Sequence, residues 1–502
     1  MSQIKTGAIL AYLNVAVSNV SALVYTPILV RALGQSVFGV YKMSDSVMAS
    51  LSLLSFGFGT AYIRFHSQLK VKNDQQGIAR LNGMYILLFS GMGLVAGVAG
   101  GSISVFSNEI FGFGLSSDEI QLAKLLMTIM TINIALTFPS SVFNSYLLVN
   151  EKFTWIYARS LILKLAGPIV GTALLFLGFG AVGATLATLL STILGLIWNA
   201  IYACRKLDMK FRIFPLHGPL FREIGVFSFW IFLSQLFSML TDNTTSFIVA
   251  SRAGAIDVAV FSVAFQMQLL FISLSTALSG LFVPRINTLV ASSASNDKLL
   301  DLMSQVGRYQ LILHCALLGA FAILGRFFLL IWVGEGYNLS FWLTIIMAVS
   351  VTAPLAQNTG IQIQQAKNMH QFRSIVYLIS ALMGAILCWL LAPWMGALSG
   401  ALGYALTMFS GTWIAMNWYY HNRVGLHMGR FWKQMFPIFL TFSVSTGVSL
   451  MLSIFVLPIT SLLNWIVMGS FYVIMNCVAL WIFVLRRSEK HQIRSLIKRS
   501  SK

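Results

Sequence analysis

Apolar blocks long enough to cross a lipid bilayer, about 17–25 residues each, recur along the whole 502-residue chain. Only 9% of the residues are charged and 57% are hydrophobic, whereas a soluble protein carries about 25% charged residues. The polar stretches between the blocks are too short to enclose a core of their own. The sequence therefore predicts an all-α polytopic membrane protein, whose N-terminal block is an uncleaved first helix rather than a signal peptide.

The apolar blocks predict about fourteen transmembrane helices. Their expected positions are roughly residues 7–30, 36–63, 81–105, 121–149, 154–177, 179–203, 224–250, 256–283, 304–333, 339–363, 372–392, 395–420, 433–456 and 460–485. Lysine and arginine lie mainly in alternate connections and in the tail RRSEKHQIRSLIKRSSK, whereas acidic residues favour the opposite connections. This positive-inside asymmetry predicts that both termini are cytoplasmic.

The net charge of +19 therefore reflects membrane topology and gives no reason to expect nucleic-acid binding. The basic tail is a candidate for contacts with anionic membrane lipids. The four cysteines lie singly on different apolar segments without metal-ligand spacing, so we expect small embedded side chains and no metal site.

An internal repeat relates the two parts of the chain at an offset of about 220 residues. Residues 28–47 align with 248–267, which places Gly34 on Gly254, and residues 180–207 align with 396–424. Each half holds six helices, so the two halves insert in the same orientation, as in secondary transporters built from parallel repeats. The predicted divisions are residues 1–215 and 216–425 for the two six-helix halves, 426–485 for two additional helices, and 486–502 for a basic cytoplasmic tail.

Polar side chains form stripes along four of the predicted helices. Lys42, Asp45 and Ser52 fall at helical spacing, so they share one face of the second helix. The other stripes include Asn14 and Ser18 on the first helix, Ser238 and Asp242 on the seventh, and Gln266 on the eighth. Because lipid does not solvate such groups, we expect these stripes to line a hydrated cavity between the halves, walled by helices one, two, seven and eight.

Two simpler interpretations stay open for these residues. Hydroxyl and amide side chains also join neighbouring helices directly, at about 0.6 kcal/mol per hydrogen bond. Lys42 and Asp45 are three residues apart, which is a spacing that allows a local ion pair to neutralise both charges.

Three segments resemble the Wzx-type polysaccharide flippases, which belong to the polysaccharide transporter family. These segments are Leu33–Tyr41 (LGQSVFGVY), Leu53–Arg64 (LLSFGFGTAYIR) and residues 180–188 (GAVGATLAT). The family lies in the superfamily that also contains the MATE multidrug exporters and the lipid II flippase. The resemblance implies a V-shaped, MATE-like transporter with alternating access. The function that it implies is translocation of a lipid-linked oligosaccharide across the bacterial inner membrane, for O-antigen, capsule or exopolysaccharide synthesis. Polysaccharide polymerase and chain-length regulator are the implied protein partners.

A polyprenyl pyrophosphate cargo would favour fixed cations in the cavity or at its cytoplasmic mouth. The candidates are Lys42, Arg64, Arg285, Lys164 and Arg308. For Arg64 and Arg285, anchoring at the lipid headgroups is an equally good explanation. The family often places an Asp and a basic residue just before the glycine matched by Gly254, but here Asp242 lies farther upstream.

The chain contains no GxxxxGK[ST] nucleotide-binding loop, so we expect a transporter and not an enzyme, without an organic cofactor. A proton or sodium gradient is a candidate energy source, with Asp45 and Asp242 as the coupling acids. The alternatives are a lipid II-type flippase and a MATE-like cation-coupled drug exporter, which would favour acids over cations in its cavity.

Overall fold

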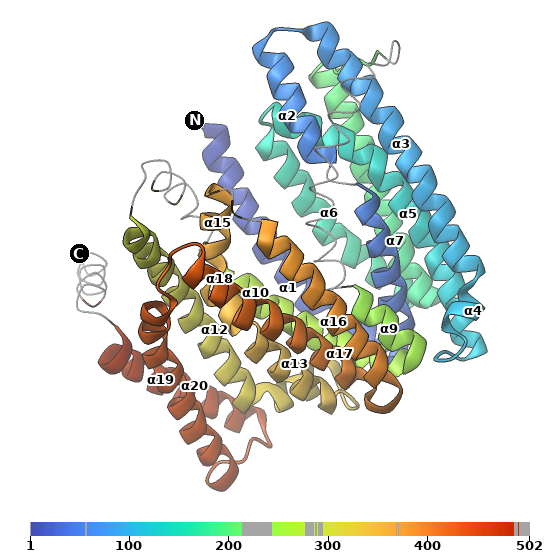
Figure 1. Cartoon of the computed structure of the whole chain (residues 1–502). Coiled ribbons are helices and arrows are strands. Elements are labelled where there is room, and N and C mark those ends of the chain that lie inside the picture. Colours follow the sequence, from blue (N-terminus) through green and yellow to red (C-terminus); the bar gives the residue numbers. More distant parts are fainter. Residues whose placement is uncertain are drawn as a thin grey trace. The chain divides into compact units, whose positions relative to one another are not determined.

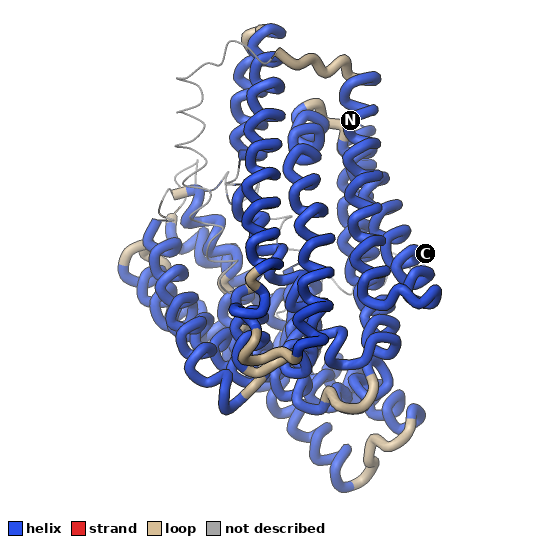
Figure 2. Tube along the Cα trace, turned by 90° about the vertical axis from the view of Figure 1, so that its right-hand side faces the viewer, coloured by secondary structure: helices blue, strands red, loops and turns tan. Residues whose placement is uncertain are grey.

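The computed structural model describes residues 2–55, 58–212, 243–276, 286, 289, 295–367, 369, 371–485 and 490. Every regular element in these ranges is a helix, as Figure 2 shows, and nine of these helices are long and apolar enough to cross a membrane. The prediction of an all-α polytopic membrane protein is therefore confirmed.

The chain forms two compact units. The first comprises Met1–Ser262 with Ala385–Gly400, and the second comprises Val263–Gly384 with Ala401–Lys502. The predicted boundary at residue 215 falls among residues 213–242, which lie outside the described ranges. The division into two halves, two extra helices and a tail stays a prediction.

The first unit is a bundle of long helices. They are α1 (Ser2–Ser50), a 3-10 segment (Leu51–Ser55), α2 (Phe58–Val71), α3 (Gln75–Val105), α4 (Ser107–Phe111), α5 (Ser117–Val149), α6 (Phe153–Leu174), α7 (Gly180–Ile201) and α9 (Thr244–Arg252). The π-helical segments Leu175–Phe179 and Tyr202–Lys206 flank α7. In Figure 1, α3 runs beside α5 and α5 beside α7, and α1 packs along α6.

Helix α1 contains the first predicted membrane helix and the first part of the second, joined by a kink at Gly34. Gly34 has φ 74° and ψ 171°, a conformation that is essentially restricted to glycine. Glycine also separates α6 from α7, because Gly178 and Gly180 have φ values of 91° and 53°. Because the chain stays helical on both sides of the Gly34 kink, α1 runs across the boundary between two expected helices.

The second unit holds the larger part of the C-terminal sequence. Its helices are most of α10 (Ala255–Thr276), α12 (Asn296–Val333), α13 (Asn338–Ser350), α14 (Thr352–Ala356), α15 (Asn358–Ala366), most of α16 (Gln371–Met395) and of α17 (Ala397–Met408), α18 (Asn417–Asn422), α19 (Met428–Phe455) and α20 (Leu462–Ala479). The π-helical segments Phe409–Met416 and Leu480–Val484 follow α17 and α20.

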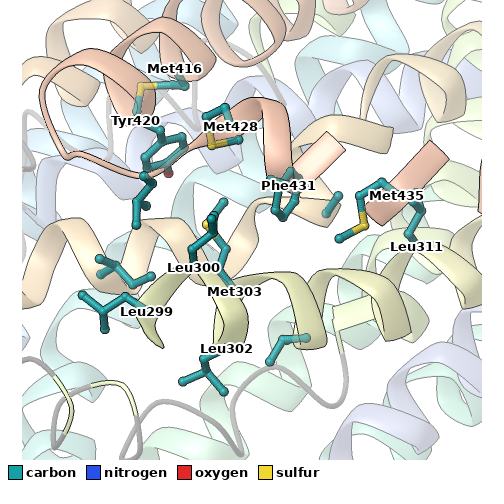
Figure 3. Packing of buried hydrophobic residues seen from close by; sticks show 14 of the residues in the cluster. Leu299, Leu300, Leu302, Met303, Leu311, Met416, Tyr420, Met428, Phe431 and Met435 are labelled. Carbon is teal, nitrogen blue, oxygen red and sulfur yellow. The ribbon is translucent and has the colours of Figure 1, made fainter. Parts of the chain in front are cut away.

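A hydrophobic core in the second unit holds the start of α12 against α18 and α19. Leu300 and Met303 meet Tyr420 and Phe431 there, as Figure 3 shows. All four side chains are at most 2% exposed, so each gains roughly 1.5–3 kcal/mol from burial. This core fixes the N-terminal turns of α12.

Helix boundaries differ from the prediction at three places. The helix expected at 36–63 is interrupted by the 3-10 segment and resumes as α2, which extends to Val71. The helix expected at 304–333 begins at Asn296. Its first two turns are amphipathic and carry charged residues, so their mean hydropathy is too low for a prediction based on apolar runs to include them. The helix expected at 339–363 is broken into α13, α14 and α15, and Pro354, which lacks an N–H group, lies in the middle piece.

Candidate functional site

A cavity of mixed polar and apolar lining lies among α1, α5 and α7 in the first unit. Its volume is about 90 Å³, which is room for several water molecules. Its lining residues are Tyr41, Asp45, Met48, Ala49, Met130, Asn133, Ile134, Thr185 and Thr188. The α1 residues come from the segment after the Gly34 kink, so the kink sets the direction in which Tyr41 and Asp45 approach α5 and α7.

Asp45 brings the negative charge of this cavity. Its side chain is exposed to the open space, and within the described part of the chain it makes no hydrogen bond and no ion pair. The Lys42 ammonium lies instead 5.8 Å from the ring centroids of both Phe38 and Tyr41, which stabilises it by cation–π contact. The structure therefore does not form the local Lys42–Asp45 ion pair.

Neutral oxygen atoms complete the polar lining. Asn133 borders the cavity, but its Oδ1 atom is buried away from the open space and has no hydrogen-bond partner among the described residues. The Thr185 and Thr188 hydroxyls donate to the carbonyls of Ala181 and Ala184, one helical turn earlier, at 3.0 and 3.2 Å. A hydroxyl that donates its only proton still has acceptor lone pairs, so both threonines can accept a hydrogen bond.

The polar stripe of the first predicted helix packs on α6. The Asn14 side chain is 4% exposed and donates to the carbonyls of Leu10 and Tyr157 at 3.1 and 2.8 Å. Lys164 donates from Nζ to the Asn14 carbonyl at 3.4 Å, and Ser18, on the same stripe, is half-buried. These contacts favour the interpretation that Asn14 and Lys164 join two helices.

Two further predicted site residues in the first unit, Ser52 and Arg64, are exposed. Ser52 lies in the 3-10 segment, where the helical spacing that groups it with Lys42 and Asp45 no longer holds. Arg64 lies on α2 with its guanidinium 5.7 Å from the Phe65 ring centroid. Neither residue lines the cavity.

Arg308, in the second unit, is 4% exposed and binds backbone carbonyls. Its guanidinium donates to Gln434 at 3.3 Å and to Val484 at 2.9 Å, which ties α12 to α19 and to the end of the segment that follows α20. This environment gives Arg308 a structural role and leaves it poorly placed to meet a phosphate. Gln266 is half-buried on α10.

Three predicted site residues, Ser238, Asp242 and Arg285, lie outside the described residues. The expected cavity between the two halves depends on the seventh helix, of which the structure describes only α9, from Thr244 onward. Their roles stay predictions.

Sequence reasoning missed the cavity residues on α5 and α7. Thr185 and Thr188 lie in the segment GAVGATLAT, which carries both the repeat and the family resemblance, three residues apart on one helical face. Asn133 is an amide within the apolar run TIMTINIALTF. These polar residues within apolar segments can be recognised in the sequence, but only the fold shows that all three line the same cavity as Asp45.

Comparison with known proteins gives a family and a fold. The sequence pattern of the family described as "Polysaccharide biosynthesis protein" matches residues 4–290, more than half of the chain. No curated protein matches the sequence.

Three solved structures share the architecture. The lipid II flippase MurJ in an inward closed conformation is 17% identical, with a TM-score of 0.72 over 94% of this chain and 98% of that chain. An inward-facing MATE multidrug transporter of the MOP superfamily is 15% identical, with a TM-score of 0.63 over 81% of this chain and 98% of that chain. An outward-facing MATE transporter is 14% identical, with a TM-score of 0.57 over 85% and 96%. At these identities the likeness shows the fold alone, which is that of a MurJ- and MATE-like multi-pass membrane protein.

Proposed function

The chain belongs to the polysaccharide biosynthesis protein family, and from that premise we propose that it is a flippase for a lipid-linked oligosaccharide. The cargo is a polyprenyl pyrophosphate that carries a glycan repeat unit. It moves from the cytoplasmic to the periplasmic leaflet of a bacterial inner membrane by alternating access, for synthesis of O-antigen, capsule or exopolysaccharide. The family match over residues 4–290 is the observation that carries this proposal.

The chemistry of the cargo explains why a polar route through the membrane is needed. The prenyl tail is soluble in lipid, but each sugar hydroxyl moved through hydrocarbon without a partner costs several kcal/mol, roughly 4–8 on the scale for transfer to a solvent that cannot hydrogen-bond. A protein cavity that opens to one side and then to the other removes that cost. A fold shared with MurJ, named as a lipid II flippase, and with MATE transporters supports alternating access.

Lys42 is the cation that we propose for the pyrophosphate. Its ammonium is half-buried on the segment after the Gly34 kink, has no ion pair to Asp45 and is held by two aromatic rings. A cation held in this way is available to a phosphate oxygen, with which it would form a charge-assisted hydrogen bond. Asp45 and, if it faces the same route, Asp242 are the proposed coupling acids.

Deletion of the gene, followed by analysis of lipid-linked intermediates, tests the function. We expect a complete repeat unit to accumulate on the inner leaflet, with loss of the surface glycan and recovery on complementation with the wild-type gene. Accumulation of the cell-wall precursor lipid II would instead assign a lipid II flippase. Unchanged glycans with new sensitivity to cationic dyes would assign a drug exporter.

Substitution of Lys42 tests the proposed cargo contact. Lys42→Ala should lower the surface glycan about tenfold at an unchanged membrane level, a loss of ~1.4 kcal/mol. Lys42→Arg keeps a cation near the rings and should keep most of the activity. Lys70→Ala, at an exposed position on α2, is the matched control. Normal glycan from Lys42→Ala would remove Lys42 from the transport route.

A further inference from the structure

The second unit contains a broken helix whose repeat mate in the first unit is continuous. The tenth predicted helix forms three pieces, α13, α14 and α15, and its backbone leaves the regular helix at Val351 (φ −85°, ψ 0°) and Gln357 (φ −97°, ψ 5°). Its mate in the repeat is the fourth predicted helix, α5, which passes through Pro139 as one helix, whereas Pro354 lies in the middle piece of the broken one. Proline alone therefore does not explain the breaks.

The first break leaves one backbone carbonyl without its helical donor, and an indole replaces that donor. The Ser350 carbonyl would pair with the N–H group four residues later, which Pro354 lacks. Trp413, on the π-helical segment that follows α17, donates from Nε1 to this carbonyl at 2.9 Å. In α5 the equivalent carbonyl, that of Ala135, packs against Gly93 of α3, where a Cβ would lie 2.6 Å from it. The second half therefore pairs the freed carbonyl through a side chain, whereas the first half covers it with backbone.

The second break is held by an amide. Gln357 is 2% exposed and donates from Nε2 to the Oδ1 atom of Asn417 at 2.9 Å. The same oxygen accepts the Nε1–H group of Trp432 at 2.6 Å. Asn417 also donates from Nδ2 to the Trp413 carbonyl at 2.9 Å. The Asn417 side chain therefore connects the second break to both tryptophans.

The two tryptophans join these contacts into one cluster. The Trp413 and Trp432 rings are stacked, with their centroids 5.5 Å apart and their planes 9° from parallel. Trp413 belongs to a π-helical segment, a rare geometry that recurs at functional sites. Trp432 belongs to α19, one of the two helices predicted to lie outside the repeat. We propose that Trp413, Asn417 and Trp432 form a latch that holds the helix α13–α15 in its broken state, and that release of this latch lets the helix straighten.

The first half shows the alternative conformation. Helix α5 stays continuous although its proline removes one backbone hydrogen bond, so a helix of this pattern is stable without breaks. Straightening of α13–α15 would exchange the side-chain contacts of Ser350 and Gln357 for backbone pairs within the helix. Two states that differ by so few hydrogen bonds are shifted by a small differential interaction elsewhere in the protein. The use of this movement in alternating access rests on the proposed function, whereas the latch itself does not.

The distance between two spin labels tests the latch on the full-length protein in lipid nanodiscs. The labels are attached through Leu339→Cys on α13 and Gln362→Cys on α15, in a background in which the exposed Cys204 and Cys477 are replaced by serine. A straight helix would place the two Cα atoms roughly 35 Å apart, at 1.5 Å per residue, and a bend shortens that distance. We expect a main population at the shorter distance and a minor one near the value for a straight helix.

Two substitutions at the first break should move this distribution in the same direction. Trp413→Phe keeps a ring for stacking but removes the donor to Ser350, so it should raise the straight population several-fold, up to about tenfold, as expected for one net hydrogen bond. Pro354→Ala restores the missing N–H group and should also raise the straight population, at an unchanged or higher Tm. The double variant should add little to Pro354→Ala, because the indole and the new N–H group serve the same carbonyl.

Trp465→Phe is the matched control. Trp465 is also half-buried and donates from Nε1 to a backbone carbonyl, that of Leu324 at 3.2 Å, but it lies on α20 outside the latch. It should lower Tm about as much as Trp413→Phe and leave the distances unchanged. Equal distance distributions in wild type, Trp413→Phe and Pro354→Ala would overturn the proposal, because a purely structural Trp413 would behave like Trp465. If Trp413→Phe does not fold, Pro354→Ala still decides the question.

Failure of this proposal is distinguishable from failure of the proposed function. A distance shift in the latch variants, together with unchanged lipid-linked intermediates in the deletion strain, would keep the latch and reject the flippase. Accumulated intermediates with one fixed distance in wild type and variants would keep the flippase and reject the latch.

Discussion

Two glycine hinges in the first unit, Gly34 and Gly254, both have positive φ but differ in the contacts beside them. Gly34 kinks α1 with φ 74°, and Gly254, which the repeat aligns with it, separates α9 from α10 with φ 104°. Beside the first hinge, the Ser36 hydroxyl donates to the Glu119 carboxylate on α5. Beside the second, the Asp257 carboxylate accepts the backbone N–H of Ala397 at 2.7 Å.

A second pair of aligned glycines behaves in the same way. Gly180 and Gly396, which begin the matching segments GAVG and GALS, have φ values of 53° and 51°. Positive φ is nearly free for glycine and strained for other residues, so these positions resist substitution. The repeat therefore retains positive φ at its aligned glycines, while the side-chain hydrogen bonds near Gly34 and Gly254 differ.

The two hinge regions touch where Gly39 packs on the backbone of Ala255, and this contact gives the largest expected effect. A Cβ on Gly39 would overlap the Ala255 carbonyl, which is backbone and cannot rotate away. We expect Gly39→Ala to destabilise the protein by about 3 kcal/mol through overpacking. The measurement is the melting temperature of detergent-solubilised protein, followed by fluorescence-detected size exclusion.

Gly97→Ala is the control for that substitution. Gly97 lies within α3, and a Cβ there would meet open space, so alanine should be neutral or stabilise the helix by about 0.5–1 kcal/mol. Equal melting temperatures for Gly39→Ala and Gly97→Ala would show that the two hinge regions do not depend on this contact.

Alanine at each hinge glycine separates backbone strain from crowding. Gly254 has positive φ, and a Cβ there would lie 2.8 Å from the Gly114 carbonyl oxygen, whereas a Cβ on Gly34 has no atom within 4 Å. We expect Gly254→Ala to cost about 2–3 kcal/mol and Gly34→Ala about 1–2 kcal/mol, the second from strain alone. The readout is again the melting temperature, and a larger loss for Gly34→Ala would contradict the assignment of crowding to the second hinge.

The repeat in the sequence marks Gly34 and Gly254, because it aligns one with the other, but it does not predict a hinge at either position. The alignment of Gly34 with Gly254 needs only local sequence, but positive φ does not follow from the residue type, because Gly39 and Gly97 lie within helices without it. The apolar blocks, by contrast, predicted the membrane helices, because helix formation in lipid is enforced by the need to pair every backbone group.

Contacts between distant segments could not be predicted in this way. Helical spacing places Asn14 on a polar face but does not say which neighbour that face meets, and the structure supplies Tyr157 on α6. The sequence of its own helix offers Arg308 as a candidate cation for the cargo. Its hydrogen-bond acceptors, the carbonyls of Gln434 and Val484, come from two later helices. The cavity at Asp45 is missed for the same reason, because its walls come from three helices.

The smallest expected effect comes from the two carboxylates that accept hydrogen bonds beside the hinges, Glu119 and Asp257. Asp257 accepts the N–H of the first residue of α17, so Asp257→Asn removes a charge from a helix N-terminus and should cost about 0.5–1 kcal/mol. Glu119 also closes a capping box with Ser116, a motif that glutamine serves equally well, so Glu119→Gln should cost no more than about 0.5 kcal/mol.

Melting curves of Asp257→Asn and Glu119→Gln, measured side by side, show whether each hydrogen bond depends on the charge of its carboxylate. Added salt should narrow the difference between wild type and Asp257→Asn, because ions screen the interaction of a carboxylate with a helix terminus. A Glu119→Gln protein that melts below Asp257→Asn would mean that the Ser36 contact depends on charge as much as the Ala397 contact does. The charge of Glu119 on α5 would then stabilise the first hinge. The two hinges would differ in which group donates to the carboxylate, and not in how much the hydrogen bond contributes to stability.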